Sequence, residues 1–263
     1  MSFLYLDLRI KMDSGNNTLF FKDIQNSLNA TWPEFADADE CDTPDCQILN
    51  RHFKCINKSG NGLKFIAQDE HMPHKHLGYE ERIYQHGLIA TRHGNWHDFF
   101  NAMVWMNFPQ SKVAINSIHQ QEIQRQKTPL RSHRRDMLTL FDECGVIVIA
   151  NKSVHELIKK HQWNTLFVKH KNLWLQEKIK LITFGHALYE KYMTPYIGMT
   201  AKALLIETHQ LAQETVDEHI ANSILQNKYL MTKANLSPLP LLGIPNWHKN
   251  QDDVFYANRN YFR

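Results

Sequence analysis

Two adjoining helix patterns over residues 95–126 constrain the fold of this chain more than any other part of its sequence. Asn95 is a favourable N-cap, and apolar residues then recur at helical spacing through residues 96–108. Pro109 suits the first turn of a second helix, which we expect to reach about residue 126. Two successive helices with an apolar stripe predict a core that is mainly helical.

The other segments carry shorter patterns. Capping boxes of Ser153 with Glu156 and of Thr215 with Glu218 indicate two further helix starts. Gly145 is expected to end the helix that precedes a β-branched run at residues 146–150. The predicted strands are 62–68, 146–150 and 201–207, and the further helices are 20–29, 131–143, 172–193 and 215–229. Residues 79–87 are expected to form a helix or a turn, and the apolar segment 88–92 follows them.

These elements predict an α+β fold: a predominantly helical single domain over residues 13–263, with a few short strands and an irregular, Pro-rich C-terminal wrap. Strands and helices do not alternate along the chain, so a doubly wound sheet is not expected. A length of 263 residues fits one hydrophobic core. Residues 1–12 are expected to be an N-terminal appendage, because Met12 could serve as the start in place of Met1.

The composition excludes several classes of protein. With 43% hydrophobic residues the chain is not disordered, and four irregularly spaced cysteines do not form a disulfide scaffold. The sequence has no stretch of 18 uninterrupted apolar residues, so we expect no membrane span. The first 13 residues lack a secretory signal pattern. We therefore expect a cytoplasmic protein with reduced thiols and no membrane contact. The net charge of +3 does not by itself indicate nucleic-acid binding.

Histidine is abundant, with 16 residues in the chain. Most of them, His119 included, are expected in loops or on polar helix faces, where composition alone explains them. Only His97 and His186 stand beside carboxylates on otherwise apolar helices. The case for histidine chemistry therefore depends on two imidazoles.

Three predicted helical segments, 92–101, 134–145 and 184–191, place ionisable groups beside an apolar stripe. Such groups are costly to bury unless they are paired. If the three helices pack together, their polar groups would meet. Two interpretations stay open: a catalytic or metal site, and a structural network of Arg–Asp and His–Glu pairs that joins the helices.

In the first interpretation each group has a role. The sequence does not identify a cofactor; a divalent metal at this site would be bound by His97, His186 and Glu190. The catalytic groups would be His97, Asp98, Asp142 and Glu143. A small anionic substrate, plausibly one with a phosphate group, would be held by Arg92, Asn101, Lys112, Arg135 and Thr139.

Standard motifs do not narrow the reaction. The sequence contains no GxSxG elbow, no GxxxxGK loop, no GxGxxG turn and no HExxH pair. The dipeptide His97-Asp98 is similar to the paired His-Asp of HD-type phosphohydrolases, but chance produces it readily in a chain rich in histidine.

Four longer segments carry a family resemblance: GLIATRHGNWHDFFNAMVWMNFPQSKVAIN, RRDMLTLFDECG, FGHALYEKYMTPYIGMTAKAL and SPLPLLGIPNW. Together, and in this order, they resemble the bacterial family filed as domain of unknown function 3025, over about residues 32–263. The resemblance implies a cytosolic, single-domain bacterial protein. It implies no activity and assigns no role to a residue.

Two hypotheses of function follow. The first is a hydrolase or transferase that uses a His and carboxylate site, with or without a metal, on an anionic substrate. The second is a non-catalytic module that binds RNA or a protein partner, with its polar groups serving as scaffold. The sequence does not indicate an oligomeric state.

Overall fold

The computed structural model describes residue 43 and residues 45–126, 130–211, 215–230 and 232–263. The predicted appendage 1–12 and the predicted helix at 20–29 lie outside the described residues. Contacts between Cα atoms divide the chain into two compact units. The described parts of residues 37–139 and 214–232 form one, which we name the helical unit, and those of residues 140–213 and 233–263 form the other, the sheet unit.

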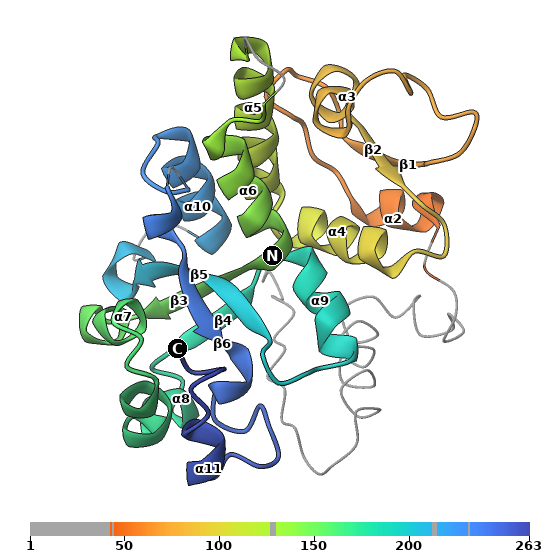
Figure 1. Ribbon diagram of the computed structural model, residues 1–263. Helices are drawn as coiled ribbons and strands as arrows, with labels where there is room; N and C mark the ends of the chain where they lie inside the picture. The colour runs from red at the N-terminus through yellow and green to blue at the C-terminus, as the bar shows by residue number, and fades with distance from the viewer. Residues whose placement is uncertain (1–42, 44, 127–129, 212–214, 231) are drawn as a thin grey trace. The chain divides into compact units, whose positions relative to one another are not determined.

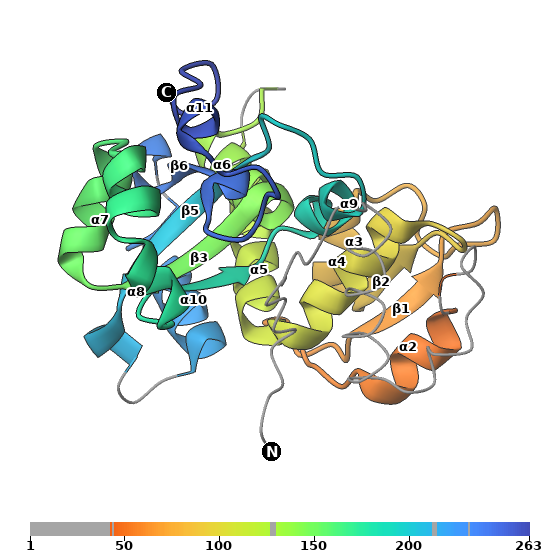
Figure 2. The same cartoon turned by 90° about the horizontal axis from the view of Figure 1, so that it is seen from below.

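In the helical unit, several helices surround one short parallel strand pair. β1 pairs with β2 from Lys64 opposite Leu88 to Ala67 opposite Thr91, and α3 connects the two strands. Helix α2 packs on β1 (Figure 2). The elements are α2 (Cys46–His52), β1 (Lys64–Ala67), α3 (Tyr79–His86), β2 (Leu88–Thr91), α4 (Trp96–Asn107), α5 (Pro109–Arg125) and α10 (Val216–Leu225). Helix α6 (His133–Cys144) begins in this unit.

Helix α5 is enclosed by its neighbours. It packs against α3, α4 and α10, and every residue from 111 to 120 is buried. Its own N-cap residue, Phe108, offers no side-chain hydrogen bond. Instead the carboxylate of Asp217, on α10, accepts hydrogen bonds from the backbone N–H groups of Gln110 and Ser111 at 2.9 and 2.8 Å. A distant side chain thus satisfies donors that a helix start leaves open.

A four-stranded sheet organises the sheet unit (Figure 1). The strand order is β4-β3-β5-β6; β3 and β5 run parallel, and the outer pairs run antiparallel. All six residues of β3 are buried. The strands are β3 (Gly145–Ala150), β4 (Lys180–Thr183), β5 (Thr200–Glu207) and β6 (Ser237–Pro240). The helices are α7 (Lys152–Lys159), the π-helical η2 (Thr165–Lys169), α8 (Lys171–Leu175), α9 (His186–Met193) and α11 (Asp253–Tyr256), with short 3₁₀ turns η3 (Thr208–Leu211), η4 (Lys233–Asn235) and η5 (Leu241–Gly243).

The predicted α+β class is confirmed, with mostly helix and a few short strands. The helices expected at 96–108 and 109–126 are α4 and α5, and the strand expected at 62–68 is β1. Of the helix or turn left open for 79–87 the structure has the helix α3, and the apolar segment 88–92 contains β2. Among the described residues, no helix combines the length and the apolar character that a bilayer span requires.

Residues 172–193 do not form the single long helix that their apolar spacing predicts. They contain most of α8, then β4 and α9. Glu177 has a φ of 56°, a left-handed conformation that does not continue a right-handed helix. Antiparallel pairing of β4 with the distant strand β3 overrides the local helix pattern. Thr183 therefore lies on a strand, whereas His186 and Glu190 are one turn apart on α9.

One boundary prediction holds and another is wrong. Helix α6 ends at Cys144, directly before Gly145, as expected, and Gly145 is itself the first residue of β3. Asn151 caps α7 in place of Ser153, because its side-chain oxygen accepts a hydrogen bond from the backbone N–H of Val154 at 3.0 Å. The C-terminal segment is more regular than predicted, since Pro238 and Pro240 lie on β6. That strand occupies a sheet edge, where a residue without an N–H group is tolerated.

Candidate functional site

A row of polar side chains lies on one side of α5. Lys112, Asn116 and His119 follow one another at intervals of four and three residues, which places them on the same helix face. They are 3%, 1% and 1% exposed. We name this row the α5 polar row. Polar groups this deeply buried cost stability unless other groups satisfy them, so the neighbours of each one matter.

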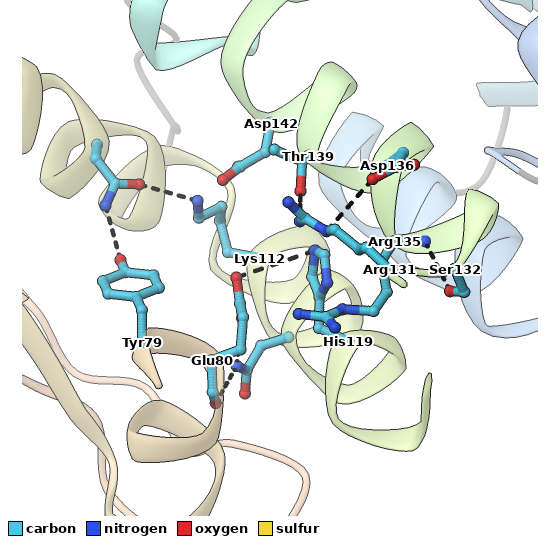
Figure 3. A network of polar contacts seen from close by, with 12 residues as sticks. Tyr79, Glu80, Lys112, His119, Arg131, Ser132, Arg135, Asp136, Thr139 and Asp142 are labelled. Carbon is cyan, nitrogen blue, oxygen red and sulfur yellow. Dashed lines mark hydrogen bonds and ion pairs between the residues drawn. The ribbon is translucent and has the colours of Figure 1, made fainter. Parts of the chain in front are cut away.

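Lys112 lies among polar and aromatic groups of α3 and α4. Its ammonium group donates a hydrogen bond to Oδ1 of Asn101 at 2.9 Å and lies 5.1 Å from the centre of the Trp105 ring, within cation–π range. The amide nitrogen of Asn101 donates to the hydroxyl of Tyr79 at 2.8 Å (Figure 3). These contacts fix the position of a positive charge inside the helical unit.

Glu80, in the first turn of α3, faces the other two members of the row. The Asn116 amide donates to Oε2 of Glu80 at 2.7 Å and to its backbone carbonyl at 2.9 Å. Nε2 of His119 lies 4.0 Å from Oε1 of Glu80 (Figure 3). The Glu80 side chain keeps 22% of its surface exposed, so the row reaches solvent at this carboxylate. The arrangement is a carboxylate and imidazole pair next to a buried ammonium group.

Arg92 and Asp98, two residues predicted for the site, bind one another. The Arg92 backbone N–H and Nε donate to Oδ2 of Asp98 at 2.7 and 2.9 Å, and its terminal nitrogen donates to Oδ1 at 2.8 Å. Burial acts to raise the pKa of Asp98, but hydrogen bonds from Arg92 and the charges of Arg92 and His97 outweigh it and lower that pKa. The Asp98 backbone N–H donates to the N-cap side chain of Asn95 at 3.0 Å. This pair stabilises the start of α4.

The polar residues in the N-terminal half of α6 also have partners within the helical unit. Arg135 donates to the side chain of Gln126 at 3.0 Å. Arg131 donates to the hydroxyl of Thr139 and lies 3.5 Å from Asp136 (Figure 3). Arg135 and Thr139, both predicted to bind substrate, thus belong to a local network at the start of this helix.

The sheet unit contains a second imidazole and carboxylate pair. Nδ1 of His186, on α9, lies 3.9 Å from Oδ2 of Asp142, on α6. His186 is buried, whereas Glu143 and Glu190 are exposed. The chain approaches closely here: a Cβ on Gly185 would lie 2.5 Å from the Glu143 carbonyl oxygen.

The predicted metal ligands come from both units, because His97 is on α4 and His186 and Glu190 are on α9. Within the described residues, no group of three or more His, Cys, Asp or Glu side chains is arranged to hold a metal ion. The proposed ligand set, and the catalytic set of His97, Asp98, Asp142 and Glu143, therefore stay predictions.

The structure joins Asn101 to Lys112 by a hydrogen bond and adds residues that the sequence analysis missed. His119 lies on a polar helix face, as expected, but this face is buried and His119 is 1% exposed. Its spacing of seven residues from Lys112, on the same predicted helix, was a signal that could have found it. Glu80 carried no such signal, because its contact with α5 bridges 36 residues to Asn116.

Comparisons with known proteins identify the family. Among curated proteins no match was found, and among solved structures there was none either. A family model described as "Protein of unknown function (DUF3025)" matches residues 63–263, a shorter stretch than the resemblance from about residue 32 suggests. Since this match covers well over half of the sequence, the chain belongs to the DUF3025 family of proteins.

Proposed function

We propose that this protein is a hydrolase or transferase that acts on a small anionic substrate by acid–base chemistry at the α5 polar row. One observation carries the proposal: the Glu80 and His119 pair lies on the same buried helix face as the ammonium group of Lys112. A general base and a fixed positive charge are the two elements that a proton-coupled attack on an anion requires.

Each group has a distinct role in such a reaction. His119 accepts the proton of an attacking water or hydroxyl group, and Glu80 stabilises the imidazolium that forms. As the bond to the leaving oxygen breaks, the imidazolium returns the proton to that oxygen. Their separation of 4.0 Å needs to shorten by about 1 Å for a hydrogen bond, and catalytic contacts commonly tighten when substrate binds. Lys112, positioned by Asn101, stabilises the negative charge of the substrate and of the transition state.

The alternative, a surface that binds RNA or an acidic protein, has less support. Nucleic-acid binding depends on exposed cations that are available to phosphates. Arg92 is paired with Asp98, Arg131 with Asp136, and Arg134 lies 3.8 Å from Glu122. These acidic partners lower the positive potential that a phosphate backbone would meet.

The test compares two buried histidines. Turnover would be measured on aryl phosphates and aryl esters for the wild type, His119→Gln and His155→Gln. His155, on α7, is 4% exposed and provides a control for the effect of altering a buried imidazole. We expect His119→Gln to lower kcat/KM at least about a hundredfold and His155→Gln to leave it within about threefold. Equal losses in the two variants would assign His119 a structural role and contradict the proposal.

The metal form of the hypothesis is tested separately. About one zinc or manganese ion per chain in the purified protein, lost in His186→Ala, would support a metal bound at His186. Chelation should then abolish turnover. Turnover that survives chelation and still requires His119 would favour the metal-free reaction.

A further inference from the structure

Three buried polar atoms at the α5 polar row have no hydrogen-bond partner among the described residues. They are Oδ1 of Asn116, Oε1 of Gln120 and Nε1 of Trp105. The three residues are 1%, 4% and 1% exposed, so bulk water does not satisfy these atoms. Native proteins leave few such atoms, and each one indicates a missing partner.

Two of the three atoms are acceptors on the same helix. Asn116 and Gln120 are one turn apart on α5, a rise of about 6 Å. The Asn116 amide nitrogen is already engaged by Glu80, which fixes the orientation of its oxygen. Two neighbouring acceptors without donors are complementary to a ligand that supplies O–H or N–H groups.

The third atom is a donor next to a positive charge. The indole N–H of Trp105 belongs to the ring that the Lys112 ammonium group faces at 5.1 Å. A neutral donor and an ammonium group together favour an anion, and lysine acts as a point charge of the kind that binds phosphate. The row therefore has an anion-binding end at Lys112 and an acceptor end at Asn116 and Gln120.

We infer that the ligand of the α5 polar row is the phosphate ester of a polyol, such as a sugar phosphate, with its phosphate at Lys112 and Trp105 and its hydroxyl groups at Asn116 and Gln120. This inference names the substrate class and rests on the proposed function for its reaction. The Glu80 and His119 pair then lies on the helix face that the polyol follows.

The experiment uses Gln120→Leu, with Gln121→Leu as its matched control. Gln121 is the next residue of α5 and is exposed, so the same chemical change there removes no buried acceptor. The unfolding midpoint of each protein would be measured alone and with glucose 6-phosphate, glucose or inorganic phosphate. In the wild type we expect glucose 6-phosphate to raise the unfolding midpoint more than glucose or inorganic phosphate does.

Gln120→Leu should have two opposite effects. Without ligand its midpoint should rise, because an unpartnered buried amide is removed. Its affinity for glucose 6-phosphate should fall at least about tenfold, while Gln121→Leu matches the wild type in both respects. A lower midpoint without ligand would mean that an ordered water satisfies Gln120, and an unchanged affinity would remove Gln120 from the site; either result overturns the inference.

The proposed function and the inference can fail separately. Binding of glucose 6-phosphate that depends on Gln120, with no turnover that depends on His119, would leave a binding site and contradict the enzyme. Turnover of aryl phosphates that depends on His119, with no stabilisation by glucose 6-phosphate beyond that by inorganic phosphate, would keep the enzyme and overturn the polyol.

Discussion

Replacing Asp217 by alanine should destabilise the helical unit by about 3 kcal/mol, because this side chain of α10 caps α5. The Asp217 carboxylate accepts two backbone hydrogen bonds, at 2.9 and 2.8 Å, from the first turn of α5. No side chain at the N-cap position of α5 can replace it. The substitution therefore removes the acceptor of two donors of a helix start, of which the one on Ser111 is buried and the one on Gln110 is partly buried.

The magnitude follows from these contacts. A hydrogen bond to a charged acceptor contributes about 1.5–3 kcal/mol, so two contribute about 4 kcal/mol. Burial opposes this gain: it raises the pKa of Asp217 even though hydrogen bonds from Ser111 and Gln110 act to lower it. Removing a desolvated carboxylate recovers about 1 kcal/mol of the loss, which leaves about 3 kcal/mol.

Urea unfolding followed by tryptophan fluorescence measures this loss. Asp217→Asn is the matched variant, since it keeps one acceptor oxygen and removes the charge. We expect it to lose about half as much as Asp217→Ala. A loss below about 0.5 kcal/mol for Asp217→Ala, the size of an ordinary surface substitution, would refute the assignment of this carboxylate as the cap of α5.

Three further substitutions test other contacts. Asp98→Asn should lower the free energy of unfolding by about 1 kcal/mol at pH 7, a modest loss because its partner Arg92 is 51% exposed. The fold lowers the pKa of Asp98, so the difference from the wild type in thermal unfolding should shrink as pH falls below 3.8. Gly185→Ala should cost the sheet unit about 3 kcal/mol by calorimetry, because its Cβ would lie 2.5 Å from backbone atoms of Glu143 and Gly145; a change under about 1 kcal/mol would contradict this. Burial lowers the pKa of His155, so as pH drops below 6.5 the unfolded chain takes up a proton before the folded chain does, and the stability of the wild type should fall. The urea midpoints of His155→Leu at pH 7.5 and 5.5 should therefore differ less than those of the wild type.

Much of the helical unit could be predicted because its signals are local. The N-cap of α4 depends on one contact over three residues, from the Asp98 backbone to the Asn95 side chain. The capping box of α10 is equally short: the Thr215 hydroxyl accepts from the Glu218 backbone, and the Glu218 carboxylate accepts from the Thr215 backbone. Contacts between residues so close in sequence form independently of the tertiary structure.

The predictions that were wrong depend on distant partners. The apolar residues around Leu181 fit a helix as well as a strand, and pairing with Val148 on β3 decides between them. Likewise, the polar residues of α5 are buried because α3, α4 and α10 enclose the helix. No local pattern distinguishes a solvated polar face from a buried one, so the burial of His119 could not be predicted.

The distribution of satisfied and unsatisfied groups along α5 favours a binding site over a structural network. At its N-terminus Ser111 is satisfied, since its hydroxyl and its N–H group both donate to Asp217. A purely structural network would continue in this way, because each unmet buried atom costs about 1–3 kcal/mol. Instead, two acceptors in the middle of the helix, at Asn116 and Gln120, have no donor among the described residues. In a purely structural role, apolar side chains at these two positions would cost less folding free energy than unsatisfied amides. The presence of the amides is therefore consistent with a ligand that donates hydrogen bonds to them.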